Sequence, residues 1–162
     1  KQYIVTDNYI GIMIESLRRK KDVLTDILNL SEDQSLLLDD PNLEPDTFEK
    51  NVNRKAALIE KLEQLDTGFE SLYDKVKEEL ESNRDIHKEQ IRQMQELIRA
   101  LTELNMQIQA TEARNKEKAT AKFAYIRQQA KEIRSSQKIV KEYYNNMMHK
   151  AYNEPHFLDN KK

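Results

Sequence analysis

The residue types that most often carry chemistry are scarce in this chain and do not form a recognisable site. It contains three histidines, His87, His149 and His156, and no cysteine, which excludes disulfides, thiolate zinc sites and cysteine nucleophiles. His149 and His156 are seven residues apart, but Pro155 lies between them. No further ligand is fixed nearby, whereas a zinc site uses three or four. We therefore expect no metal site, no cofactor and no enzymatic activity.

Phosphate-binding loops are excluded by the glycines. The chain has two, Gly11 and Gly68, whereas a dinucleotide fingerprint needs three clustered glycines and a P-loop needs two followed by Lys-Ser/Thr. Two glycines and three prolines also cannot supply the turns that a multi-stranded β fold needs about every 8–12 residues. The composition favours long helices.

The charges are distributed unevenly along the chain. Residues 1–110 hold 15 Lys/Arg and 23 Asp/Glu, a net charge of −8, and residues 111–162 hold 12 and 6, a net charge of +6. A nucleic-acid site needs a concentrated positive face, but acidic residues interrupt the cations, which spread around the expected helix. No run approaches the roughly 18 apolar residues of a membrane span, and Ala119 and Ala130 make a weak insertion face. We expect neither nucleic-acid binding nor direct membrane insertion.

Helical periodicity divides the chain into three segments. Prolines and acidic residues between 39 and 46 mark a loop. A weaker signal for the end of one helix and the start of the next lies near residues 81–85. The sequence predicts a single domain, 1–162, with helices at about 7–38, 46–82 and 86–150 and a flexible tail at 151–162. From Ile91 to Met147, apolar residues at alternating steps of three and four predict one helix with a coiled-coil seam. The predicted fold is all-α, an elongated antiparallel three-helix bundle or coiled coil with a very long third helix.

The second half of that third helix is the candidate binding surface. At 1.5 Å per residue, its roughly 65 residues span about 100 Å, and two shorter helices cover only about half of this length. An exposed apolar seam indicates an interaction site, here for a partner helix with anchors at i, i+3, i+4 and i+7. Alternatively, the seam folds back inside the chain or forms a homodimer. The seam residues are Ala119, Phe123, Ile126, Ala130, Ile133, Val140, Tyr144 and Met147.

Taken together, several segments of the chain resemble the FlgN family of flagellar export chaperones. The resemblance is carried by the opening helix Tyr9–Leu17, the second-helix stretch Asn53–Asp66, the long third helix and the ending Phe157–Lys162. It implies a cytoplasmic helical protein that binds the C-terminal amphipathic helices of hook–filament junction proteins and prevents their premature assembly. Delivery of these clients to the export gate is also implied.

The resemblance also implies roles for parts of the third helix. Its C-terminal half is the part that holds the client, and its basic charge would attract an acidic client helix in a salt-dependent manner. A tyrosine of the C-terminal region contacts the export gate in some relatives, and the sequence does not choose among the candidates. Another flagellar chaperone, of the filament-cap type, and a structural coiled-coil homodimer are the alternatives. The candidate tyrosines are Tyr125, Tyr143, Tyr144 and Tyr152.

Overall fold

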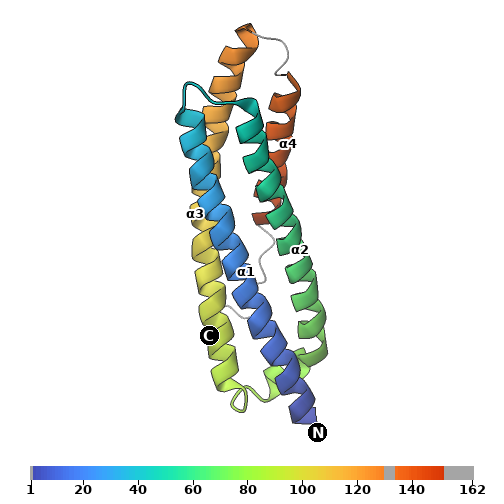
Figure 1. Cartoon of the computed structure of the whole chain (residues 1–162). Helices are drawn as coiled ribbons and strands as arrows, with labels where there is room; N and C mark the ends of the chain where they lie inside the picture. Colours follow the sequence, from blue (N-terminus) through green and yellow to red (C-terminus); the bar gives the residue numbers. More distant parts are fainter. Residues whose placement is uncertain (1, 130–133, 152–162) are drawn as a thin grey trace.

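The computed structural model describes residues 2–129 and 134–151 and gives side chains for residues 5–128 and 138–147. The elements in these ranges are the α-helices α1 (Gln2–Asp39), α2 (Pro45–Ser82), α3 (Lys88–Gln129) and α4 (Arg134–Ala151). Consecutive helices run in opposite directions along one long axis (Figure 1). The prediction of an all-α fold is confirmed.

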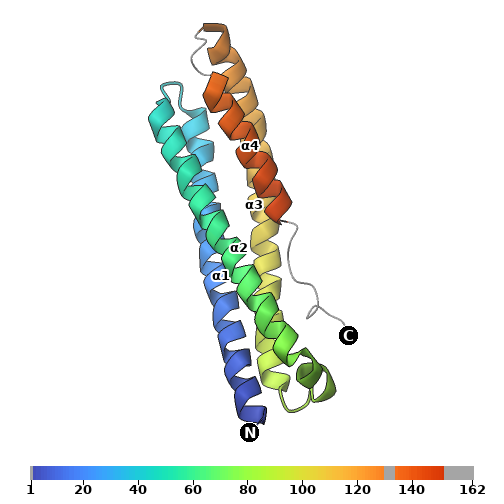
Figure 2. The same cartoon turned by 90° about the vertical axis from the view of Figure 1, so that its right-hand side faces the viewer.

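The prediction of a very long third helix, 86–150, is wrong. This segment forms two helices, α3 and α4, which lie side by side and run antiparallel (Figures 1 and 2). Residues 130–133, between them, and 152–162, which hold most of the expected tail, lie outside the described part of the chain. Burial explains the reversal. A straight helix would leave in water both the apolar face of its C-terminal half and the surface of α2 and α3 that α4 covers. The folded-back arrangement buries these two surfaces against each other.

The loop between α1 and α2 follows from its prolines and acidic residues. The Asp40 side chain accepts a hydrogen bond from the backbone N–H of Asn42 at 2.9 Å, which closes a turn after α1. Pro45 occupies the first turn of α2, where its missing N–H leaves no hydrogen bond unmade. These residues set the position at which α2 turns back along α1.

The predicted three-helix bundle is replaced by an arrangement of four helices, in which the shorter α4 lies along part of the length of the other three. Helix α1 packs against α2 and α3, and α4 packs against the same two helices. Along α4, therefore, α1 and α4 lie diagonally opposite each other, and so do α2 and α3 (Figure 2). Buried apolar side chains of all four helices, among them Leu17, Phe48, Leu101 and Val140, belong to one core.

His87, one of the three histidines of the chain, lies between α2 and α3, at the end of the bundle away from the start of α4. His87 is buried, with Nε2 at 3.1 Å from Glu79 and Nδ1 at 3.6 Å from Asp7. The side chain therefore lies where the first turns of α1, the end of α2 and the start of α3 meet, and its contacts are those of a residue that holds these segments together. Within the described residues, no cluster of three or more His, Asp and Glu side chains is arranged to hold a metal ion.

Candidate functional site

A buried ion pair lies at the centre of the four-helix part of the bundle. The ammonium group of Lys55 on α2 donates to both carboxylate oxygens of Glu112 on α3, at 3.0 and 2.9 Å. Both side chains are 0% exposed. Lys55 also donates to Gln34 Oε1 at 3.1 Å and to Ser31 Oγ at 3.4 Å, both on α1. A single cation therefore connects the diagonal pair α2 and α3 and also reaches α1.

Two adjacent tyrosines connect α4 to this ion pair. The Tyr143 hydroxyl donates to Glu112 at 2.5 Å, and the Tyr144 hydroxyl donates to Gln34 at 2.8 Å. The Lys55 ammonium lies 4.6 Å from the centroid of the Tyr143 ring, within the range of a cation–π interaction. Because Gln34 is on α1, diagonally opposite α4, these hydrogen bonds fix both the position and the rotation of α4.

Two amides complete the polar network around the pair. Gln34 donates to Asn51 Oδ1 at 3.0 Å, and Asn51 donates to the Leu30 carbonyl at 3.0 Å. Asn115 donates to the Ser31 carbonyl at 2.8 Å. Since buried polar groups cost free energy unless they are hydrogen-bonded, this network favours one register of the four helices over others. We call these residues the polar network: Ser31, Gln34, Asn51, Lys55, Glu112, Asn115, Tyr143 and Tyr144.

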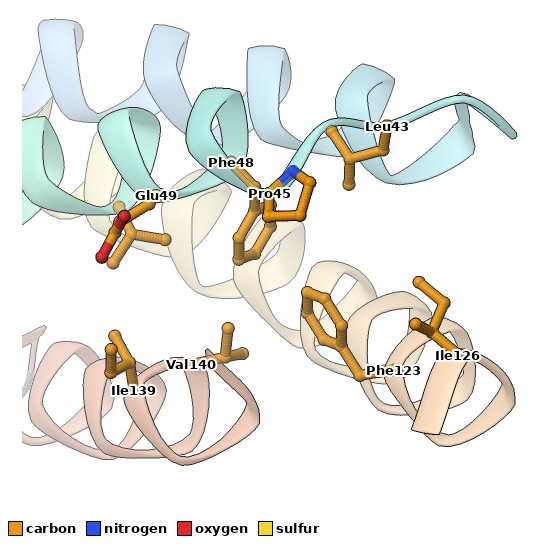
Figure 3. Close-up of a pocket in the computed structure, with 9 residues that line it drawn as sticks. Leu43, Pro45, Phe48, Glu49, Phe123, Ile126, Ile139 and Val140 are labelled. Carbon is orange, nitrogen blue, oxygen red and sulfur yellow. The ribbon is translucent and has the colours of Figure 1, made fainter. Parts of the chain in front are cut away.

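Beside the polar network, an apolar cavity of about 210 Å³ opens between the start of α2 and α4. Phe48 and Val52 of α2, Phe123 of α3 and Val140 of α4 contribute to its lining. Figure 3 shows Phe48 above, Phe123 at the lower right and Ile139 and Val140 at the lower left, on three different helices. An engineered apolar cavity of roughly 150 Å³ can bind benzene, so this one can hold a leucine or phenylalanine side chain of a partner. We call it the apolar cavity.

The structure divides the predicted seam between two helices instead of presenting it as one exposed stripe. Phe123, Ile126 and Val140 come together at the apolar cavity. Ala119, Tyr144 and Met147 are buried. The described seam residues thus lie partly inside the bundle and partly at the cavity. Ala130 and Ile133 lie outside the described residues.

A comparison with protein families decides the assignment. The sequence model of the family described as FlgN protein matches residues 10–149, most of the chain. The chain belongs to the FlgN family. It is therefore assigned to the flagellar export chaperones, a chaperone family rather than an enzyme family. Searches of curated proteins and of solved structures gave no match.

The tyrosines that the resemblance to the FlgN family nominated for the export gate occupy different environments. The Tyr125 side chain on α3 is 63% exposed. Tyr143 and Tyr144 are buried with their hydroxyls engaged in the polar network. Tyr152 lies outside the described residues. Of the described candidates, Tyr125 alone presents its ring to solvent.

Sequence reasoning missed most of the polar network in this FlgN-family chain, although a signal was present. Glu112 and Asn115 interrupt the apolar seam at in-phase positions, but the spacing alone gives them no partners. Lys55 follows Val52 by three residues and precedes Ile59 by four, so it is in phase with the apolar stripe of α2. A charged residue in phase with a buried stripe predicts a buried charge, which needs an opposite charge from another helix.

No described helix of this FlgN-family chain contains a stretch long and apolar enough to cross a lipid bilayer. The exposed apolar side chains are instead dispersed over the bundle, as with Ile12 on α1, Met106 on α3 and Ile139 on α4. Ile139 is the one among these that borders the apolar cavity. At the cavity, therefore, exposed apolar surface lies beside a concave apolar lining.

The buried tyrosines give a prediction for alkaline solution. Burial first, and then the Glu112 carboxylate, raise the pKa of Tyr143 and of Tyr144 above the ordinary value of 10.0. A folded-state pKa above the unfolded one means that their stabilising contribution is complete below pH 10 and is lost as the pH rises further. Absorbance titration of tyrosinate should therefore show a late phase that coincides with loss of helical circular dichroism.

The variant Tyr143→Phe/Tyr144→Phe is the control for that titration. It keeps both rings but removes the two hydroxyls, so the late phase should disappear while the remaining tyrosines titrate as before. A late phase of unchanged amplitude in this variant would contradict the assignment. So would ionisation of all tyrosines of the parent chain near pH 10 without any loss of helix.

Proposed function

We propose that this chain is a cytoplasmic export chaperone that binds the C-terminal amphipathic helices of hook–filament junction proteins. It prevents their premature assembly and delivers them to the export gate. Family membership supports the export role, and the apolar cavity between α2 and α4 is the observation that supports helix binding. The cavity combines a buried apolar floor with Ile139, which is 41% exposed at its mouth.

The client helix inserts an apolar anchor into the cavity. Anchors spaced at i, i+3, i+4 and i+7 allow an amphipathic helix to lie along a groove with one face buried. Full burial of one leucine or phenylalanine side chain contributes about 1.5–3 kcal/mol. Two or three such anchors, reduced by the entropy of association, give reversible binding. The same anchors are then unavailable for assembly with other flagellar subunits, and no covalent step is needed.

Calorimetry with peptides from hook-junction C-terminal helices tests the cavity. The variant Ile126→Glu/Ile139→Glu places two carboxylates at its mouth, where neither side chain is fully buried. We expect at least a tenfold loss of affinity, about 1.4 kcal/mol, because the client anchor would have to desolvate a charge. Circular dichroism should show an intact helical fold.

The matched control is Met106→Glu, which introduces a carboxylate at another exposed apolar position of α3. It should bind the peptides as the parent chain does. Equal affinity in the cavity variant and the parent would overturn the cavity as the client site. A tight homodimer that binds none of these peptides would favour the structural alternative, and binding only to filament-cap peptides would favour the other chaperone class.

Export-gate docking is the second part of the proposal, and Tyr125 is the described candidate whose ring is available for it. Its side chain is exposed and does not line the apolar cavity. The variant Tyr125→Ala therefore separates the two parts of the proposal. It should keep its affinity for client peptides and lose binding to the gate component, whereas unchanged gate binding would exclude Tyr125.

A further inference from the structure

A groove of about 560 Å³ lies between α1 and α2. It belongs to the half of the bundle that α4 does not reach (Figures 1 and 2). The two helices that form its walls are connected by side chains. The Ser16 hydroxyl donates to the Leu65 carbonyl at 3.5 Å, and the Lys75 ammonium lies 5.3 Å from the centroid of the Tyr9 ring. We call this hollow the α1–α2 groove.

Both glycines of the chain line this groove. Gly11 and Gly68 lie inside α1 and α2, where glycine is less favourable than alanine because it loses more conformational freedom on folding. A Cβ atom at either position would have no contact within 4 Å with a neighbouring part of the chain. Packing inside the chain therefore does not require glycine at these positions. What glycine provides is room for a second backbone to approach closely from outside.

Accessible apolar side chains lie beside the two glycines. Ile12 lines the groove together with Leu65 and Leu72, which are half-buried. Val5 precedes Ile12 by seven residues, so both lie on the same face of α1, and they are 50% and 53% exposed. These are the parts of a knobs-into-holes contact, with Ile12 as the knob and the space over Gly68 as the hole.

The charges along α1 indicate which partner fits the groove. The row Asp7, Gly11, Glu15 and Arg19 runs at steps of four residues, and all four residues line the groove. Two such rows that run antiparallel about a two-fold axis would place Asp7 of each copy opposite Arg19 of the other. Glu15 lies nearer the middle of the row, where Arg18 of its own helix lies 3.8 Å away and balances its charge.

Both ends of the row are accessible to a second chain. Asp7 and Arg19 are exposed. In the described part of the chain, Arg19 forms no ion pair, and Asp7 is near one cationic candidate, His87 Nδ1 at 3.6 Å. A uniformly acidic helix of another protein would meet a like charge at Asp7, and a uniformly basic helix would meet one at Arg19. A second copy of α1 meets an opposite charge at both ends.

We propose that the α1–α2 groove is the interface of a homodimer, in which α1 of each copy lies antiparallel in the groove of the other. Near the two-fold axis, Gly11 and Gly68 let the backbones approach, and Ile12 of one copy lies over Gly68 of the other. At the two ends, Asp7 pairs with Arg19. The apolar cavity lies in the other half of the bundle, so the dimer leaves it open. The proposal does not depend on the proposed function.

Sedimentation equilibrium of the full chain tests the dimer. The parent chain should dimerise reversibly with a micromolar dissociation constant, because two helix pairs bury a small interface. Gly11→Leu/Gly68→Leu should weaken the dimer at least tenfold, since its side chains occupy the space for the second backbone. Helical circular dichroism should be retained. The control Ala56→Leu/Ala113→Leu changes exposed small residues outside the groove and should alter the dissociation constant less than threefold.

Three results of this experiment would overturn the proposal. They are a parent chain that stays monomeric throughout the micromolar range, an unchanged dissociation constant in the glycine variant, and equal losses in the glycine variant and its control.

Two charge variants test the antiparallel arrangement. Asp7→Arg and Arg19→Glu each place like charges opposite each other in a homodimer, so each variant alone should dimerise at least tenfold more weakly than the parent. An equimolar mixture should dimerise again, because position 7 of each variant then faces an opposite charge at position 19 of the other. Circular dichroism checks the fold of Asp7→Arg, since Asp7 lies near His87. A mixture no tighter than the separate variants would overturn the antiparallel dimer.

Hook-junction peptides separate the dimer interface from the client site. Gly11→Leu/Gly68→Leu should keep at least half of the parent affinity for these peptides, and the cavity variant Ile126→Glu/Ile139→Glu should dimerise as the parent does. A glycine variant that loses peptide binding but keeps the parent dimerisation would assign the groove to a client and overturn the proposal. A parent chain that forms the groove-dependent dimer but binds none of the peptides would support the dimer and contradict the proposed function.

Discussion

The variant Lys55→Met should lower the free energy of unfolding by about 3–5 kcal/mol, because it leaves the buried Glu112 carboxylate without its cation. The Glu112 side chain is 0% exposed, and Lys55 supplies hydrogen bonds to both of its oxygens. Tyr143 would remain as a donor, but a neutral hydroxyl does not balance the charge. Urea unfolding followed by far-ultraviolet circular dichroism measures the loss.

The triple variant Lys55→Met/Glu112→Leu/Tyr143→Phe should recover this stability. It removes both charges together with the hydroxyl that would otherwise lose its acceptor. Burial lowers the pKa of Lys55 to about 8, even though Glu112 acts in the opposite direction. Desolvation therefore outweighs the attraction, and replacing such a pair by apolar side chains is often neutral or stabilising by about 1–4 kcal/mol.

The comparison between the two variants decides what the ion pair contributes. If the triple variant is as unstable as the single one, the pair itself stabilises the fold, and our interpretation of the desolvation cost is wrong. If the triple variant is stable, the pair contributes chiefly to the selection of one helix register. The rate of proteolysis within α4 of the triple variant would then show whether this helix keeps one register or shifts along the bundle.

The variant Phe123→Ala should lower the free energy of unfolding by about 3–5 kcal/mol, the usual cost of truncating a buried phenylalanine. Phe123 packs edge-to-face against Phe48, with ring centroids 5.3 Å apart and an interplanar angle of 74°. Both rings are buried. This contact joins the last turns of α3 to the first turns of α2, so the loss measures how firmly the two helix ends are packed.

The control for that variant is Tyr125→Ala, two residues further along α3. Its exposed ring should contribute no more than about 0.5 kcal/mol. The double variant Phe48→Ala/Phe123→Ala should show a coupling energy of about 0.5–1.5 kcal/mol, as expected for an aromatic pair. A Phe123→Ala cost no larger than that of Tyr125→Ala would contradict the packing of α3 against α2.

Much of the fold could be predicted from residues whose effects are local. Pro41 and Pro45 indicated where α1 ends and α2 begins, and the steps of three and four along the seam indicated helix. The same steps could not locate the reversal after Gln129. One continuous helix and two antiparallel helices would both place Phe123 and Val140 on buried faces. In addition, no glycine or proline lies between α3 and α4. The choice between them depends on contacts with α2, which are distant in sequence.

The candidate site was predictable to a smaller degree for the same reason. Phe123, Ile126 and Val140 were selected as apolar seam positions, and the structure brings them to one cavity. Phe48 and Ile139, which complete it, depend on where α4 lies against α2. Lys55, Ser31 and Gln34 are in phase with the stripes of their own helices, but hydrogen-bond partners cannot be assigned until the helices are placed in space.

The Lys55–Glu112 pair also has a consequence for the order of events during synthesis on the ribosome. Lys55 emerges 57 residues before the carboxylate that pairs with it. Within the α1–α2 hairpin alone, the Lys55 ammonium has Gln34 and Ser31 of α1 as acceptors but no opposite charge, so we expect its burial to be favourable only once α3 supplies Glu112. Tyr143 and Tyr144 emerge later still, so the docking of α4 completes the fold. We therefore expect the first two helices to pack tightly only after their partners have been made.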